Sequence, residues 1–100
     1  MDPVLNRRIS SIFVNELENF KKIMQTLPES ENEELFQFNL HKIRPSMVIF
    51  EMEALIKQSE SLLDKKKRGE EIPCGDQDWQ NALSYTDYAL DSLKAFLQSL

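Results

Sequence analysis

Apolar residues recur along most of the chain at intervals of three and four, the spacing that places them on one face of an α-helix. Asp2 and Pro3 precede the first run as a cap and a first helical residue. Pro28 follows it and disfavours helical geometry in the residue before it. The run predicts a helix at about residues 3–27. Its apolar members are Leu5, Ile9, Phe13, Leu17, Phe20, Met24 and Leu27.

A second run has its apolar stripe at Phe36, Leu40, Ile43, Met47 and Phe50. Ser30 and Glu33 precede it with the spacing of a capping box, in which each side chain accepts a hydrogen bond from the other residue's backbone N–H. Pro45 lies inside the run and lacks the amide hydrogen that a helix uses at that position. Because the stripe stays in phase beyond Pro45, we expect a kinked helix at about residues 30–50 rather than an end at the proline.

Two further helices follow. The third has the stripe Met52, Leu55, Ile56, Ser59, Leu62 and Leu63. The cations of 65–68 and then Gly69 are typical of a helix C-terminus, so this helix is expected at about residues 52–68. A single helix over 30–68 would be about 57 Å long at 1.5 Å per residue, far longer than the others. A break is therefore predicted near Phe50 and Glu51.

The last helix is expected at about residues 76–99, with Asp76 as its cap. Its stripe is Trp79, Leu83, Leu90, Leu93, Leu97 and Leu100, with Phe96 beside it in the core. Four helices of similar length joined by short turns predict an all-α protein. The expected architecture is an antiparallel up-down-up-down four-helix bundle, formed as a single domain by residues 1–100.

Composition and charge exclude several classes of protein. A content of 41% hydrophobic and 29% charged residues is typical of a globular domain and not of a disordered one. The net charge of −5 argues against a general nucleic-acid binder. A single Cys74 cannot form an internal disulfide and fits a reducing compartment. No apolar run approaches the roughly 18 residues of a membrane span, and the N-terminus lacks a signal peptide. We expect a cytoplasmic monomer that neither spans a membrane nor binds nucleic acid.

His41 is the only histidine, and it lies roughly 140° around the second helix from the core stripe, so it should face water. A metal site would need further His or Cys ligands, so we expect no metal there. A neutral imidazole is a good nucleophile near neutral pH and suits phosphate. Arg44, one turn further on, is the first candidate to stabilise phosphoryl charge. Lys42 is a weaker candidate, and Ser46 could add a hydrogen bond.

The string His41-Lys42-Ile43-Arg44-Pro45-Ser46 resembles the signature of histidine-containing phosphotransfer (HPt) domains. In that family the phosphoacceptor histidine is followed by any residue, an aliphatic residue, a basic residue, usually glycine, and a small residue. Pro45 stands where glycine is usual, and Glu51 stands where the histidine helix often ends in glycine. The order of the expected helices extends the resemblance to nearly the whole chain.

The resemblance implies a phosphorelay carrier of two-component signalling, which accepts a phosphoryl group on His41 and exchanges it with a receiver-domain aspartate. Its partners would be a response-regulator receiver domain, a histidine kinase, or both. No glycine-rich phosphate loop or Mg²⁺-binding carboxylate set is visible, so we expect no autonomous kinase activity and no cofactor. In the family, a polar side chain on the next helix often orients the imidazole. That position falls near Leu63, and Glu60 and Asp64 are the nearest polar residues. The alternative is a helical adaptor of HPt shape that is not phosphorylated.

A second stripe on the His41 helix, opposite the core stripe, is formed by Phe38, His41, Pro45 and Val48. Apolar side chains that flank a reactive histidine on an exposed face are typical of a partner-docking surface. Gln37 and Arg44 would form its polar rim. The competing interpretation is that the helix is buried on both sides, with Phe38 in the core.

Overall fold

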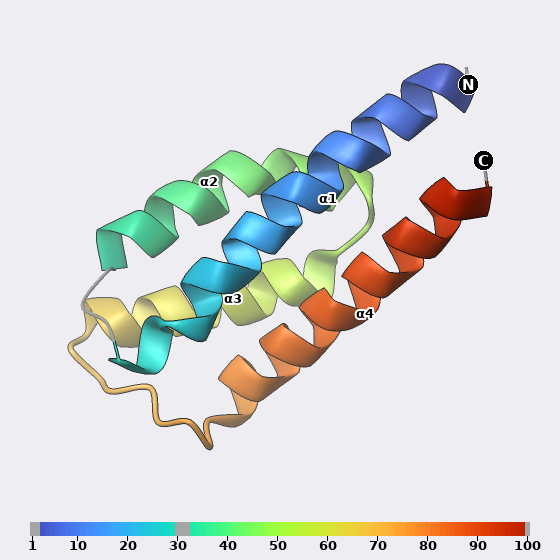
Figure 1. Ribbon diagram of the computed structural model, residues 1–100. Helices are drawn as coiled ribbons and strands as arrows, with labels where there is room; N and C mark the ends of the chain where they lie inside the picture. Colours follow the sequence, from blue (N-terminus) through green and yellow to red (C-terminus); the bar gives the residue numbers. More distant parts are fainter. Residues whose placement is uncertain (1–2, 30–32, 100) are drawn as a thin grey trace.

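The computed structural model describes residues 3–29 and 33–99, and within these ranges the chain is all helical, without strands (Figure 1). The all-α class is therefore confirmed. The helices are α1 (Pro3–Gln25), the short 3-10 helix η1 (Leu27–Glu29), α2 (Glu33–Ile49), α3 (Glu53–Lys67) and α4 (Gln77–Ser99). Each of the four α-helices lies within the range expected for it from the sequence, whereas η1 was not predicted. The caps predicted at Asp2 and Ser30 lie outside the described residues.

The core is built from the apolar stripes of the helices. α1 packs against α2 and α4, and α3 packs against the same two helices. Phe13 stacks on Phe50 with ring centroids 4.5 Å apart, and Phe20 stacks on Phe36 at 5.4 Å. The buried apolar side chains include Leu17, Phe36, Met47, Leu55, Leu62 and Ala82, which together come from four helices. The periodicity in the sequence therefore identifies most of the core.

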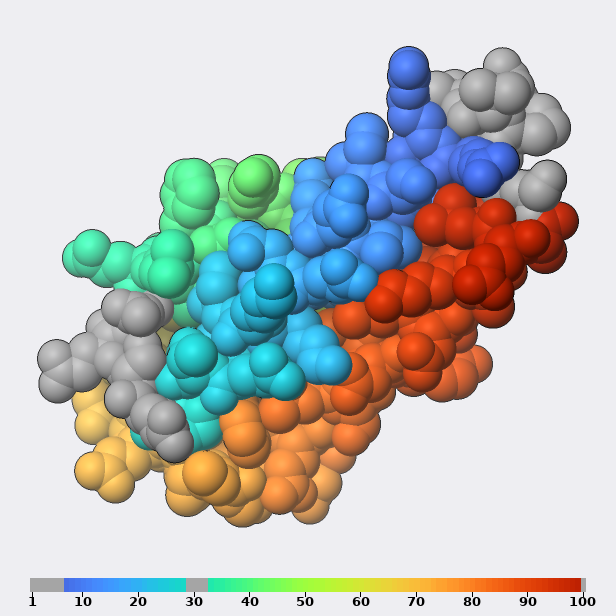
Figure 2. Space-filling view, viewed as in Figure 1, coloured from blue at the N-terminus to red at the C-terminus, as the bar shows by residue number. Residues whose placement is uncertain are grey.

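One end of the molecule consists of α1 and α4 alone. Each of these helices has 23 residues, whereas α2 has 17 and α3 has 15. The N-terminal part of α1 and the C-terminal part of α4 therefore run side by side past the turn between α2 and α3 (Figures 1 and 2). Phe96 and Ile9, both in this region, are 42% and 38% exposed. The prediction that Phe96 lies in the core is wrong, because neither α2 nor α3 reaches this end to cover it.

α2 continues through Pro45, as the phase of its stripe predicted, and ends at the predicted break. Glu51 adopts a positive φ of 57°. Its backbone N–H donates to the Val48 carbonyl at 3.1 Å, and the N–H of Met52 donates to the Met47 carbonyl at 2.8 Å. These two bonds form a Schellman motif, which normally has glycine at the left-handed residue. A non-glycine residue in this conformation costs about 1–2 kcal/mol.

α3 ends in the same motif, with glycine in the left-handed position. Gly69 has a φ of 75°, its N–H donates to the Lys66 carbonyl at 3.0 Å, and the N–H of Glu70 donates to the Lys65 carbonyl at 2.9 Å. The predicted stop at Gly69 is therefore confirmed. The predicted cap of α4 is confirmed as well, since Oδ1 of Asp76 accepts from the Trp79 N–H at 3.0 Å.

Candidate functional site

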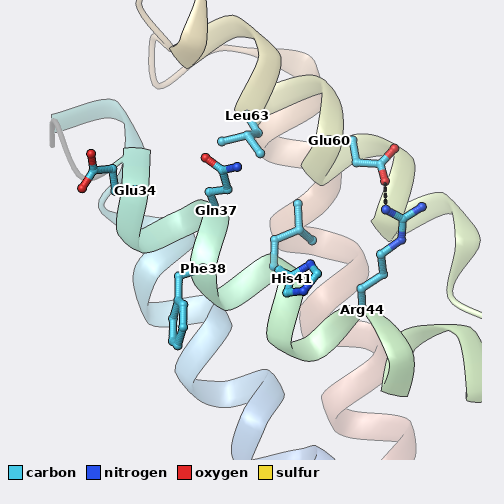
Figure 3. A pocket seen from close by; sticks show the side chains of 8 residues that line it. Glu34, Gln37, Phe38, His41, Arg44, Glu60 and Leu63 are labelled. Carbon is cyan, nitrogen blue, oxygen red and sulfur yellow. Dashed lines mark ion pairs between the residues drawn. The ribbon is translucent and has the colours of Figure 1, made fainter.

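His41 lies on the outer side of α2 and is exposed, as predicted from its angle to the core stripe. It lines an open pocket of about 450 Å³ between α2 and α3 (Figure 3). α2 contributes most of the wall because it presents residues of successive turns to the same groove. The lining residues are Glu34, Gln37, Phe38, Leu40, His41 and Arg44 from α2, and Glu60 and Leu63 from α3.

Arg44 lies one turn after His41 in the same pocket, and its side chain reaches across to α3. Nη1 of Arg44 is 3.0 Å from Oε1 of Glu60, and the two side chains are 56% and 41% exposed (Figure 3). The arrangement places Arg44, the predicted phosphate-stabilising residue, and His41 in the lining of one pocket. It also shows a feature that the sequence did not predict, namely that this guanidinium already has a carboxylate partner.

Lys42 and Ser46 were also candidates to stabilise phosphate, and the structure directs both toward α1 instead. Oγ of Ser46 donates to Oε2 of Glu16 on α1 at 3.5 Å. Lys42 lines a small hollow with Glu16 and Asn19. At about 100° per residue, Lys42 and Ser46 lie on one side of His41 and Arg44 lies on the other, so the two sides contact different helices. Of the three candidates, Arg44 alone lines the pocket of His41.

The position expected to orient the imidazole is occupied by an apolar side chain. Leu63 lines the pocket of His41, and Gln37 points toward Leu63 (Figure 3). Of the two polar residues nearest to this position, Glu60 pairs with Arg44, and Asp64 is exposed outside the pocket. Within residues 3–29 and 33–99, the His41 ring makes no hydrogen bond or ion pair. The imidazole is therefore held by its own helix and not by a polar partner on α3.

The outer face of α2 is apolar and open to solvent. Phe38 is 66% exposed and Val48 is 58% exposed, so the competing interpretation that places Phe38 in the core is wrong. Leu35 and Ile49, which the sequence analysis left out, are exposed on this helix as well. Helical spacing in the sequence could have identified both residues as part of this face. Leu35 is three residues before Phe38, and Ile49 is four residues after Pro45. We call Leu35, Phe38, Pro45, Val48 and Ile49 the outer stripe.

The described residues contain neither a candidate metal cluster nor a candidate membrane-spanning helix. In this part of the chain, no three or more His, Cys, Asp or Glu side chains are grouped as a metal site would require. None of its helices combines the length and the apolar character needed to cross a membrane. Comparisons of the chain with protein-family models, with curated proteins and with solved structures find no match.

Proposed function

We propose that this protein is a phosphorelay carrier of two-component signalling, which accepts a phosphoryl group on His41 and exchanges it with a receiver-domain aspartate. The main support is the geometry around the one histidine. Its ring is exposed at an open pocket, a guanidinium lies one turn away, and apolar side chains flank it. This combination gives a phosphoryl group access, a positive charge and a surface on which its donor can dock.

The transfer needs a nucleophile and a stabilising charge, and the pocket offers both. The unprotonated nitrogen of His41 attacks the phosphorus of an aspartyl phosphate, so an N–P bond forms as the P–O bond breaks and the aspartate leaves as a carboxylate. The proton on the other ring nitrogen can pass to solvent because the ring is exposed. Arg44 interacts with the phosphoryl oxygens, whose charge is the main target for stabilisation in this chemistry.

The proposal includes the class of partner and its location. A receiver domain or a histidine kinase in the cytoplasm would pack apolar surface on Phe38 and Val48.

The proposal also includes the order of the helices. An antiparallel up-down-up-down order is supported by contacts between helices, since residues later in α1 pair with residues earlier in α2 or α4. The pairs are Glu16–Ser46 and Asn19–Asn39 for α1 and α2, and Glu18–Lys94 and Lys21–Asp87 for α1 and α4.

A phosphate-transfer assay tests the proposal. The protein is incubated with a receiver domain that has been phosphorylated with acetyl phosphate, and acid-labile, base-stable phosphate is measured. We expect His41→Gln to abolish this label while leaving helicity and melting almost unchanged, because an exposed side chain contributes little packing. Label that persists in His41→Gln would exclude this histidine as the acceptor.

Two neighbouring variants serve as controls in the same assay. Arg44→Ala should slow the transfer without preventing binding of the receiver domain, because the guanidinium is proposed to act on developing phosphoryl charge. Lys42→Ala removes an equal charge from the next residue after His41, on the side that faces α1. Lys42→Ala should therefore slow the transfer less than Arg44→Ala does. Equal rates in the wild type and in Arg44→Ala would make Arg44 a surface cation without a role in transfer.

An adaptor that is not phosphorylated is the second candidate. Two observations favour it: Leu63 occupies the position of the orienting side chain, and Arg44 is already paired with Glu60. The outer stripe would then bind a signalling partner in the absence of any transfer. Partner binding that is equal in the wild type and in His41→Gln, together with no label in either protein, would support this function.

A further inference from the structure

The pocket of His41 contains more negative than positive charge before any phosphate arrives. Glu34 and Glu60 contribute two carboxylates to its lining, and Arg44 is the one cation among the lining residues. Arg44 is also engaged, because its Nη1 lies 3.0 Å from Oε1 of Glu60 (Figure 3). The resting pocket is therefore poorly prepared to hold an anion.

A phosphoryl group on His41 would bring about 1.5 to 2 negative charges into this pocket at neutral pH. Arg44 could stabilise them fully only by leaving Glu60, whose carboxylate would then remain in the same pocket as the new charge. The change of partner is feasible because the ion pair is open to solvent, with side chains 56% and 41% exposed. Exposed pairs of this kind are weak and rearrange easily.

We propose that Glu60 competes with the phosphoryl group on His41 for Arg44, and thereby sets how readily the phosphohistidine gives up its phosphoryl group. This inference rests on the proposed function. Glu60 makes the phosphorylated state less favourable relative to the resting state, so the protein passes the phosphoryl group on rather than storing it. If Glu60 instead held Arg44 in place for phosphate, it would make the phosphorylated state more favourable relative to the resting state.

The onward step returns the pocket to its resting state. A carboxylate oxygen of the acceptor aspartate attacks phosphorus, a P–O bond forms and the N–P bond breaks. The ring nitrogen keeps the electron pair of that bond. The imidazole leaves as a neutral group because its other nitrogen has taken a proton from solvent, to which His41 is exposed. Arg44 is then free to pair with Glu60 again, which adds a favourable contact to the product side of the transfer.

The experiment uses phosphoramidate as a chemical donor, so it needs no cognate partner. Its P–N bond breaks, ammonia leaves, and the phosphoryl group forms an N–P bond with His41. Phosphorus NMR then measures the ratio of phosphorylated to free protein at a fixed ratio of phosphoramidate to ammonium. Glu60→Gln should raise this ratio about 1.5- to 5-fold, the range expected for loss of an exposed ion pair.

Two further variants separate competition from a general charge effect. Asp64→Asn removes an equal charge from an exposed position on α3 that does not line the pocket, and it should leave the ratio near the wild-type value. In an Arg44→Ala background, Glu60→Gln should have a smaller effect than in the wild type, because no guanidinium remains for which the two anions compete.

The outcomes distinguish this inference from the function on which it rests. A ratio that is unchanged in Glu60→Gln overturns the competition, and a lowered ratio identifies Glu60 as a positioning residue instead. Either result leaves the relay function standing if the receiver-domain assay labels His41. Absence of phosphohistidine in the wild type under both donors overturns the relay function and this inference together.

Discussion

Two of the ion pairs that join α3 to neighbouring parts of the bundle differ in exposure. Nζ of Lys65 lies 2.8 Å from Oδ2 of Asp76, and these side chains are 24% and 12% exposed. Arg44 and Glu60 pair at 3.0 Å with side chains that are 56% and 41% exposed. Both pairs therefore have good ionic geometry, but water reaches the Arg44–Glu60 pair far more easily.

The partners around each carboxylate explain what the two pairs do. Asp76 also accepts the Trp79 N–H and so caps α4. The hydrogen bond from Lys65 lowers the pKa of the Asp76 carboxyl, and the same bond raises the pKa of the Lys65 ammonium. Glu60, in the described part of the chain, has Arg44 as its ionic partner, and nothing else fixes its carboxylate. A carboxylate with several fixed partners stabilises the fold, whereas one with a single exposed partner can exchange it.

Of the two pairs, the less exposed one should have the larger effect on stability. Asp76→Ala removes both the cap of α4 and one of the two carboxylate partners of Lys65. The free energy of unfolding should therefore fall by about 0.5–2 kcal/mol, the range for loss of an N-cap side chain. Urea denaturation measures this change. Asp78→Ala is the control. Oδ2 of Asp78 lies 3.3 Å from Nζ of Lys65, and the Asp78 side chain is 44% exposed, so this variant should lose less unfolding free energy than Asp76→Ala. Equal losses would show that the cap contributes nothing.

Acid should remove the same contribution. The pKa of Asp76 is lower in the folded protein than in the unfolded chain, where a carboxyl of this type titrates at about 3.9. Its stabilisation is therefore complete above that value and is lost as pH falls through the lower, folded pKa. The difference in unfolding free energy between the wild type and Asp76→Ala should shrink as pH falls below about 3.9. A difference that is constant down to the acid transition would contradict this assignment.

The surface beside the exposed pair should matter for binding rather than for folding. Phe38→Ala should weaken receiver-domain binding by about 1 kcal/mol or more, as expected for an interface anchor. The same variant should change the free energy of unfolding by no more than about 0.5 kcal/mol. Titration calorimetry and urea denaturation measure the two effects.

Phe36→Ala is the matched control on the opposite face of α2. Phe36 is fully buried, and its truncation should cost about 3–5 kcal/mol of stability. A loss of that size in Phe38→Ala would mean that Phe38 belongs to the core.

The smallest effect on stability is expected at the exposed pair itself. Glu60→Gln should change the free energy of unfolding by less than about 0.5 kcal/mol, because an ion pair in contact with water gains little over its hydrated charges. Urea denaturation at low and high salt measures it. A loss above about 1 kcal/mol would show that Glu60 stabilises the fold as Asp76 does, and would remove the contrast between the two pairs.

Local physics in the sequence determined the helices, their ends and the exposure of His41. Apolar periodicity identified α1 to α4, and the phase of the stripe around Pro45 identified a helix that continues through proline. The stop at Gly69 and the cap at Asp76 were also predicted, because each depends on residues within one turn of the helix end. The outward direction of His41 follows from its angle to the core stripe on the same helix.

Only the tertiary structure decided which side chains meet across helices. Arg44 pairs with Glu60, while Ser46 pairs with Glu16, because opposite sides of α2 contact α3 and α1. Phe96 is exposed because α2 and α3 end before they reach it. Helical periodicity gives the angle of a residue on its own helix, but it contains no information about which neighbour lies at that angle or how far that neighbour extends. The partner of the proposed phosphate-stabilising arginine therefore could not be read from the sequence.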